Sequence, residues 1–210
     1  MKMILVIFSF FIFACGNTYK KTEINSQSQI SGKDTCDSPD ADIGCNFRNA
    51  PSELTEVMTI CGDSEPGQKI RIDGQILKSD GVTPYSGIII YAYQTDSTGH
   101  YSKSGNESGA QKWQGRLHGW CKTDSEGKYV INTIRPGRYP SNEYPAHIHW
   151  AIMEPDGKMQ YLNDFVFSDD SLVTKEYVSN PYYKTGDIGV LTLSEPVNGI
   201  MTALRITVLK

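Results

Sequence analysis

The chain has 210 residues, of which 39% are hydrophobic and 10% aromatic, which is enough for one packed domain and argues against a disordered chain. Its formal net charge is −4 and it has no basic cluster, so nucleic acid is excluded as an expected partner. Glycine is frequent and helix-favouring runs are scarce, a balance that favours an all-β domain with many turns.

Residues 1–14 are predicted to be a signal peptide, with Lys2 before an apolar stretch that is too short to span a bilayer as a helix. The following Cys15, preceded by a small residue, resembles the lipobox of bacterial lipoproteins. This resemblance implies that Cys15 becomes the lipidated N-terminus, and that the domain is exported and anchored to a bacterial membrane, facing the periplasm or the cell exterior. An ordinary secretory signal cut nearby is the alternative.

Residues 15–66 are predicted to be a lipidated tether followed by a cysteine-containing extension, made of loops and one helical turn after Ser52. In an oxidising compartment the remaining cysteines can form two disulfides, and Cys36 with Cys45 is the favoured pair because the two are close in a loop-like stretch. No C-x-x-C pair indicates a zinc site. The four cysteines of this exported part are Cys36, Cys45, Cys61 and Cys121.

Residues 67–210 are predicted to form a β-sandwich of short strands with long loops and little helix. Residues 69–77 alternate apolar and polar side chains, and residues 87–93 form an apolar run expected to be buried on both faces. A short helix is expected within residues 168–178, capped by Ser168 or Asp169. Further strands are expected at residues 129–131, 147–152, 161–167 and 203–209.

Two histidines, His147 and His149, lie two positions apart in one predicted strand and therefore share a face, while Ile148 points to the core. Two neighbouring imidazoles can bind one metal ion or form a pH-sensitive patch. Just upstream, a proline-containing turn over residues 134–140 is expected to direct Tyr139 back at the two imidazoles.

Three stretches resemble the core of the intradiol ring-cleavage dioxygenases, the family of protocatechuate and catechol dioxygenases. They are residues 74–102 (ending GHYS), residues 116–140 (ending TIRPGRYP) and residues 145–150 (PAHIHW). The resemblance implies an Fe(III) cofactor and an oxidoreductase that uses O2 to cleave a small aromatic diol between its two hydroxylated carbons, as in the breakdown of aromatic compounds. The implied iron ligands are Tyr101, Tyr139, His147 and His149.

The family pattern further implies that Tyr139 and His149 are axial, and that Tyr139 leaves the iron when a catechol binds and then accepts a substrate proton. The ligand set also suits the ion. Ferric iron favours anionic oxygen together with imidazole, and a bound cation favours the deprotonated phenol.

The sequence departs from the family at two positions near the predicted site. The arginine that the family carries three positions before the first histidine, where it polarises the substrate, is Tyr144 here, and a family glutamine corresponds to Asp164. Both are predicted to lie beside the iron ligands, as is Arg138. Arg135 and Arg116 are further candidates to replace the missing arginine. These motifs do not specify which aromatic diol is the substrate.

The sequence leaves three other interpretations open. A non-catalytic, lipid-anchored, transthyretin-like binding module is the main alternative, since loss of the arginine fits a domain without catalysis. A cupin-like metal protein would use His147, His149 and Glu154. A thiol nucleophile at Cys121 with His118 as its base is disfavoured, because strand residues three apart face opposite ways.

Overall fold

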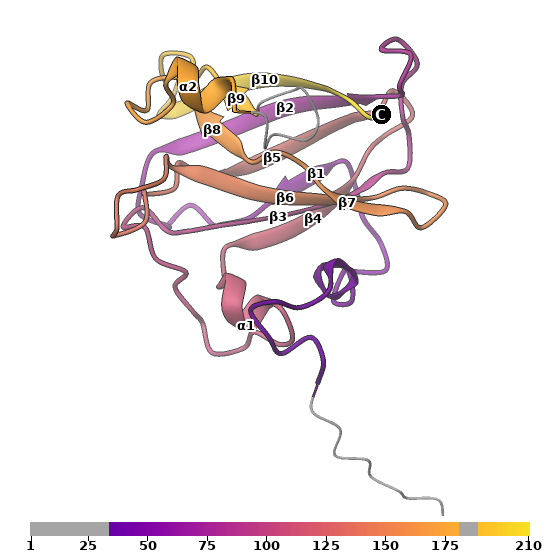
Figure 1. Cartoon of the computed structure of the whole chain (residues 1–210), viewed down its shortest axis with the longest axis horizontal. Helices are drawn as coiled ribbons and strands as arrows, with labels where there is room; N and C mark the ends of the chain where they lie inside the picture. The colour runs from indigo at the N-terminus through magenta and orange to yellow at the C-terminus, as the bar shows by residue number, and fades with distance from the viewer. Residues whose placement is uncertain (1–33, 181–188) are drawn as a thin grey trace, which may run out of the picture. The chain divides into compact units, whose positions relative to one another are not determined.

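Two β-sheets make up the part of the chain that this computed structural model describes, residues 34–180 and 189–210 (Figure 1). The first sheet has the order β1 (Val57–Thr59), β5 (Lys128–Ile134), β2 (Lys69–Leu77) and β10 (Ile200–Val208). The second has the order β4 (His118–Lys122), β3 (Ile89–Gln94), β6 (His147–Met153), β8 (Phe165–Phe167) and β9 (Val190–Leu191), with β7 (Met159–Tyr161) paired to β6.

Helix is scarce in these ranges: the 3₁₀ turn η1 spans Ile43–Asn46, α1 spans Gln111–Gln114 and α2 spans Lys175–Val178. The predicted all-β sandwich is therefore confirmed. Lys33–Lys210 form one compact unit, so the described part of the N-terminal extension packs with the sandwich. The predicted signal peptide and Cys15 lie outside the described residues. No helix within the described residues is long and apolar enough to cross a membrane.

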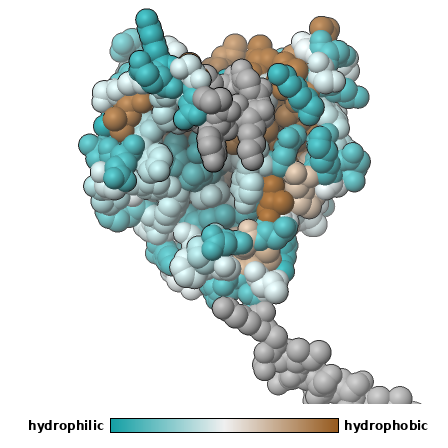
Figure 2. Space-filling model, in the orientation of Figure 1, coloured by the Kyte–Doolittle hydropathy of each residue, from teal (hydrophilic) through white to brown (hydrophobic). Residues whose placement is uncertain are grey.

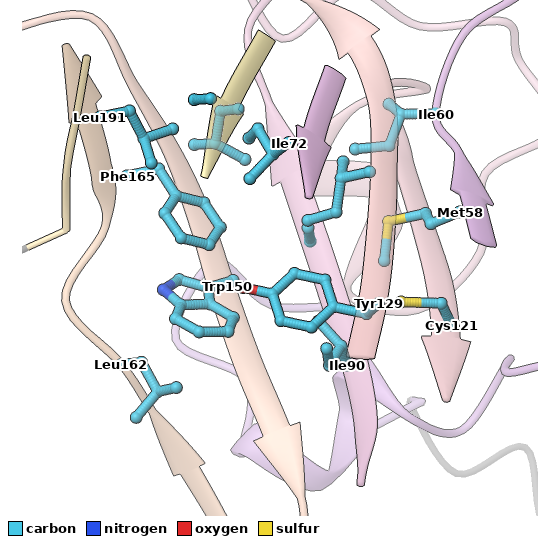
Figure 3. Packing of buried hydrophobic residues seen from close by; sticks show 14 of the residues in the cluster. Met58, Ile60, Ile72, Ile90, Cys121, Tyr129, Trp150, Leu162, Phe165 and Leu191 are labelled. Carbon is cyan, nitrogen blue, oxygen red and sulfur yellow. The ribbon is translucent and has the colours of Figure 1, made fainter. Parts of the chain in front are cut away.

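The core lies between the two sheets because each strand alternates its side chains (Figure 3). Along β2 every second residue is buried, as the pattern of residues 69–77 predicted. Trp150 of β6 stacks on Phe165 of β8 with ring centroids 4.5 Å apart. A Cβ at Gly74 would come within 2.0 Å of the Tyr129 ring, so only glycine lets that ring lie flat against β2.

The outer face of the first sheet carries exposed apolar side chains. Leu204 is 72% exposed and Ile206 49% exposed, both on β10. Figure 2 shows hydrophobic atoms along the top of the molecule, where β10 lies in Figure 1, while most of the remaining visible surface is hydrophilic.

Two helix predictions were wrong in position. The residues after Ser52 lead into strand β1, and the helical turn lies earlier, at η1, where the Asp42 side chain accepts from Gly44 N. The later helix begins after Thr174, whose side chain accepts from Tyr177 N, and not after Ser168 or Asp169. Asp169 does not cap a helix because its carboxylate binds the guanidinium of Arg135.

The stretch predicted as one strand over residues 161–167 is divided between β7 and β8. The favoured disulfide between Cys36 and Cys45 is present. The second disulfide that the cysteine count allowed is not formed, since Cys61 and Cys121 are free. Cys121 lies fully within the core, and burial raises the pKa of its thiol to about 12.

Candidate metal centre and adjoining pocket

The four predicted iron ligands come together at one point of the structure. Tyr139 Oη lies 2.6 Å from Tyr101 Oη, 3.1 Å from His147 Nε2 and 3.2 Å from His149 Nε2. The two Nε2 atoms are 3.1 Å apart. Residues separated by almost fifty positions thus place two phenol oxygens and two imidazole nitrogens within reach of a single ion.

Two loops that touch through their backbones bring the tyrosines together. Tyr101 follows β3 and Tyr139 follows β5. Gly137 N donates to Asp96 O at 2.8 Å, and Thr95 Oγ1 donates to Gly137 O at 2.8 Å. A Cβ at Gly99, whose φ is 85°, would lie 1.8 Å from a carbonyl oxygen of the other loop. The close approach therefore requires glycine at this position.

The two histidines project from β6 on the same face, as predicted, while Ile148 between them is fully buried. His147 Nδ1 lies 2.7 Å from the carbonyl oxygen of Pro145, and His149 Nδ1 lies 2.9 Å from Asp164 Oδ1. Both partners are acceptors, so the ring protons sit on Nδ1 and each Nε2 keeps a free lone pair facing the phenols.

Burial favours the uncharged forms of three of the four donors. Burial raises the pKa of Tyr101, and its hydrogen bond with Tyr139 raises it further. Burial also raises the pKa of Tyr139, and burial together with the neighbouring His149 lowers the pKa of His147. Only added positive charge at this point would deprotonate both phenols, which is what a bound metal ion supplies.

The donor set fits a ferric ion. Metal–ligand bonds of roughly 2 Å place adjacent ligand atoms about 3 Å apart, close to the spacing found among these four atoms. Two phenolates would offset much of the charge of Fe(III), and imidazole completes a set that this ion favours. Asp164 also lies near the histidines, but its oxygen faces Nδ1 of His149, on the ring edge away from the cluster. Asp164 therefore orients His149 in the way that carboxylates beside metal-bound histidines do.

Tyr93 provides a second constraint on His149. The two residues are paired across β3 and β6, and their rings stack with centroids 4.7 Å apart. The imidazole of His149 is thus held at one edge by Asp164 and on one face by Tyr93.

None of the three arginines considered as substitutes reaches the four donors. Arg116 binds Glu65, Arg135 binds Asp169, and Arg138 binds Asp170. Arg138 instead contributes to the site indirectly, through its contact with Asp170. The carboxylate of Asp170 accepts from Arg138 and from the backbone N–H of Ala146, so it joins the Tyr139 turn to the start of β6.

Tyr144, at the position of the missing arginine, is 58% exposed, and its ring centroid lies 6.5 Å from that of Tyr139. Tyr144 thus lies beside the predicted ligand Tyr139, and the two rings are in a T-shaped arrangement. The structure therefore places Asp164 and Tyr144 next to the predicted ligands. The guanidinium of Arg138 instead contacts Asp170.

A pocket of about 280 Å³ opens beside Tyr139 and His149. Its other aromatic walls are Tyr93, Tyr101, Trp113 and Tyr161. Sequence reasoning missed Trp113 and Tyr161 as pocket residues. The one available signal was the long polar loop of residues 94–115, which contains Trp113.

Two of the alternatives, the cupin arrangement and the thiol nucleophile, have no matching geometry among the described residues. Glu154 accepts from Tyr85 Oη at 2.7 Å and pairs with Lys158, and it is not among the residues around the two histidines, so the cupin arrangement is not formed. His118 Nδ1 donates to Gly115 O while Cys121 lies in the core, so no thiol–imidazole pair exists.

The chain is similar to several known proteins. Residues 44–206 match the family described as Dioxygenase. Over 118 residues the chain is 28% identical to the protocatechuate 3,4-dioxygenase beta chain of Burkholderia cepacia, covering 53% of this chain and 50% of that one. Over 141 residues it is 26% identical to the catechol 1,2-dioxygenase of Candida albicans, covering 53% and 45%. The chain thus spans about half the length of these curated relatives.

Among solved structures, the dioxygenase domain of a dioxygenase and carbohydrate-binding protein fusion from Streptomyces sp. SirexAA-E is similar in fold. The TM-score is 0.57 at 17% identity, with 76% of this chain and 91% of that chain covered. The family match covers most of the described sandwich and includes all four convergent donors. By this match, the chain belongs to the intradiol ring-cleavage dioxygenase family.

Proposed function

We propose that this chain is a non-haem iron(III) dioxygenase that uses O2 to cleave a catechol-type ring between its two hydroxylated carbons. The observation that supports this most strongly is the convergence of Tyr101, Tyr139, His147 and His149 beside an aromatic pocket. The family match supports the same reaction class. The iron ligands, the substrate and the activity are part of the proposal.

Tyr101, Tyr139, His147 and His149 would hold the iron, which when bound would chelate the two catechol oxygens and make the ring accessible to O2. Among these residues, Tyr139 is the one best placed to accept a proton from the substrate. Its oxygen lies within hydrogen-bond distance of the three other donors and its side chain also lines the pocket. With iron bound, Tyr139 would be a phenolate, and a phenolate in that position can take a proton from a bound catechol hydroxyl and become a phenol.

The pocket would orient the substrate by its aromatic walls. Trp113 and Tyr161, which line the same pocket as Tyr139 and His149, supply flat apolar surface for a catechol ring. The site contains no arginine to polarise the substrate, so the chain's own contribution consists of ligand placement, ring stacking and proton transfer at Tyr139 Oη.

Oxygen uptake with product analysis tests this proposal. Iron-loaded protein is supplied with catechol, hydroxyquinol and protocatechuate under isotope-labelled O2. We expect at least one of them to yield a ring-opened diacid that carries both labelled oxygen atoms. Tyr139→Phe should lower the rate by about 100-fold or more. Catechol chelation without any oxygen uptake across the panel would instead favour the non-catalytic binding module.

A further inference from the structure

One wall of the pocket comes from a part of the chain that precedes the family match. Ser38, Pro39 and Ala41 are among the residues that line the pocket. The match to the family begins at residue 44, so these three residues lie outside the matched segment. We propose that the loop from Cys36 to Cys45, here named the cystine loop, is a selectivity wall that restricts the site to small, uncharged catechols. This inference rests on the proposed iron-dioxygenase function.

The cystine loop is closed at its base and buried there. The Cys36–Cys45 disulfide joins its ends, and both cysteines pack against Ala110, which also lines the pocket. Cys36 is 1% exposed and Cys45 is 7% exposed. The loop is therefore held against the pocket rather than free in solvent.

Next to its first cysteine, the cystine loop is also tied to α1, which provides a neighbouring wall of the pocket. The carboxylate of Asp37 accepts from Lys112 Nζ at 2.7 Å and from Trp113 Nε1 at 3.2 Å. Figure 1 shows this indigo stretch running next to α1. The pocket-lining indole of Trp113 is thus positioned by a loop residue.

The residue after the cystine loop orients two more pocket side chains. Asn46 is 1% exposed, and its Nδ2 donates to Tyr161 Oη at 2.9 Å while its Oδ1 accepts from Gln114 Nε2 at 2.9 Å. Both Tyr161 and Gln114 line the pocket. The cystine loop, α1 and β7 therefore form one connected rim.

The chemistry of this rim disfavours a charged substituent on the substrate. Among the described residues that line the pocket, none is a lysine, arginine, aspartate or glutamate. Two lysines lie next to the lining residues: Lys112 is paired with Asp37, and Lys103 Nζ lies 5.9 Å from the centroid of the Trp113 ring. A substrate carboxylate would lose water without gaining a cationic partner among the described lining residues, which is costly. The volume of about 280 Å³ is also at the small end for ligand pockets, which fits a single ring with small substituents.

Anaerobic calorimetric titration of the iron-loaded protein tests the wall without requiring turnover. The ligands are catechol, protocatechuate and a catechol carrying a tert-butyl group. We expect wild type to bind catechol about tenfold or more tightly than either of the others. In a Cys36→Ser/Cys45→Ser double variant, and in wild type after reduction of the disulfide, the discrimination against the tert-butyl compound should fall to about threefold or less.

Two single variants localise the effect to the pocket side of the loop. Ala41→Phe should narrow the pocket and weaken catechol binding by about tenfold. Asp40→Ala is the matched control, because Asp40 is exposed in the same loop and does not line the pocket. It should leave all three affinities unchanged.

The outcomes separate the two levels of the proposal. If wild type binds neither iron nor any catechol, both the proposed iron-dioxygenase function and the proposed selectivity wall are refuted. If wild type binds catechols but its discrimination is the same in the double variant, the reduced protein and Ala41→Phe, the wall is refuted while the proposed function stands. Equal or tighter binding of protocatechuate by wild type would refute the uncharged-substrate part.

Discussion

Asp164 is the residue whose contact with a predicted iron ligand is easiest to test. Its Oδ1 lies 2.9 Å from His149 Nδ1 and fixes which ring nitrogen faces the site. We predict that Asp164→Ala lowers the affinity for Fe(III) by about 10- to 100-fold, as loss of such partners typically does. Asp164→Asn, which keeps an acceptor oxygen, should lose less. Competition against a chelator of known affinity measures both, and equal affinities for Asp164→Ala and wild type would refute the role.

The ligands themselves could be predicted from the sequence because each lies in a short motif. His147 and His149 follow from strand periodicity, and Tyr101 and Tyr139 from GHYS and GRYP. The destinations of the arginines could not be predicted. Arg138 stands next to Tyr139 in the chain, yet its guanidinium binds Asp170, which lies more than thirty positions later. Such long-range pairing leaves no local pattern.

At the scale of elements, Asp170 holds the Tyr139 turn against β6. Burial raises the pKa of its carboxyl, but hydrogen bonds from Arg138, Leu172 and Ala146 outweigh this and hold the pKa below its ordinary value. Because the folded-state pKa is depressed, the stabilisation is complete above the unfolded pKa of roughly 4 and is lost as the pH falls through the lower, folded value.

We therefore predict that Asp170→Asn lowers the free energy of unfolding by about 3 kcal/mol at neutral pH, since it removes a buried carboxylate and leaves the partly buried guanidinium of Arg138 without its anionic partner. The difference from wild type should shrink below about pH 4. Asp169→Asn is the matched control, because Asp169 is 60% exposed and its pair with Arg135 should contribute about 1 kcal/mol or less. Urea unfolding at neutral pH and below about pH 4 measures these differences. If the free energy of unfolding of Asp170→Asn differs from that of wild type by the same amount at both pH values, this role of the Asp170 carboxylate is contradicted.

The Cys36–Cys45 disulfide closes a short loop, since the two cysteines are nine positions apart. Loss of this closure should lower the free energy of unfolding by about 2–3 kcal/mol, as the Cys36→Ser/Cys45→Ser variant would show in thermal or urea unfolding. Cys61→Ser, which removes a free thiol, serves as the control and should change stability by about 1 kcal/mol or less. An unchanged stability in the double variant would contradict a structural role for the disulfide.

β2 was easier to predict than the helices because burial alternates along it. The pattern of residues 69–77 survives in β2 over its whole length. Helix caps were misplaced because Ser, Thr and Asp recur throughout residues 168–174, and only tertiary contacts decide which one caps. Asp169 and Asp170 bind arginines, which leaves Thr174 to cap α2.

At the scale of the whole molecule, we propose that the chain is exported and lipidated at Cys15. Expressed with its natural start in a bacterial host, the protein should incorporate labelled palmitate and sediment with membranes. Cys15→Ser should abolish both. An unlabelled product cut near residue 15 would instead indicate an ordinary secretory signal.

The pocket is the part of the molecule that sequence reasoning did not reach. Its walls come from the cystine loop, α1, β7 and the ligand loops, which meet only in the folded chain. Asn46 connects three of them, yet as a single asparagine among loop residues it carries no recognisable signal. Motifs could therefore identify the donors, while the shape of the space beside them required the structure.

The central claim is that two phenolates and two imidazoles of this chain bind one ferric ion. Visible absorption and resonance Raman spectra of the iron-loaded protein test it most directly. We predict one iron per chain, a red-brown phenolate-to-iron(III) charge-transfer band, and loss of part of that band in Tyr101→Phe and in Tyr139→Phe. One tightly bound iron without any phenolate band, or a band that both substitutions leave unchanged, would contradict the claim.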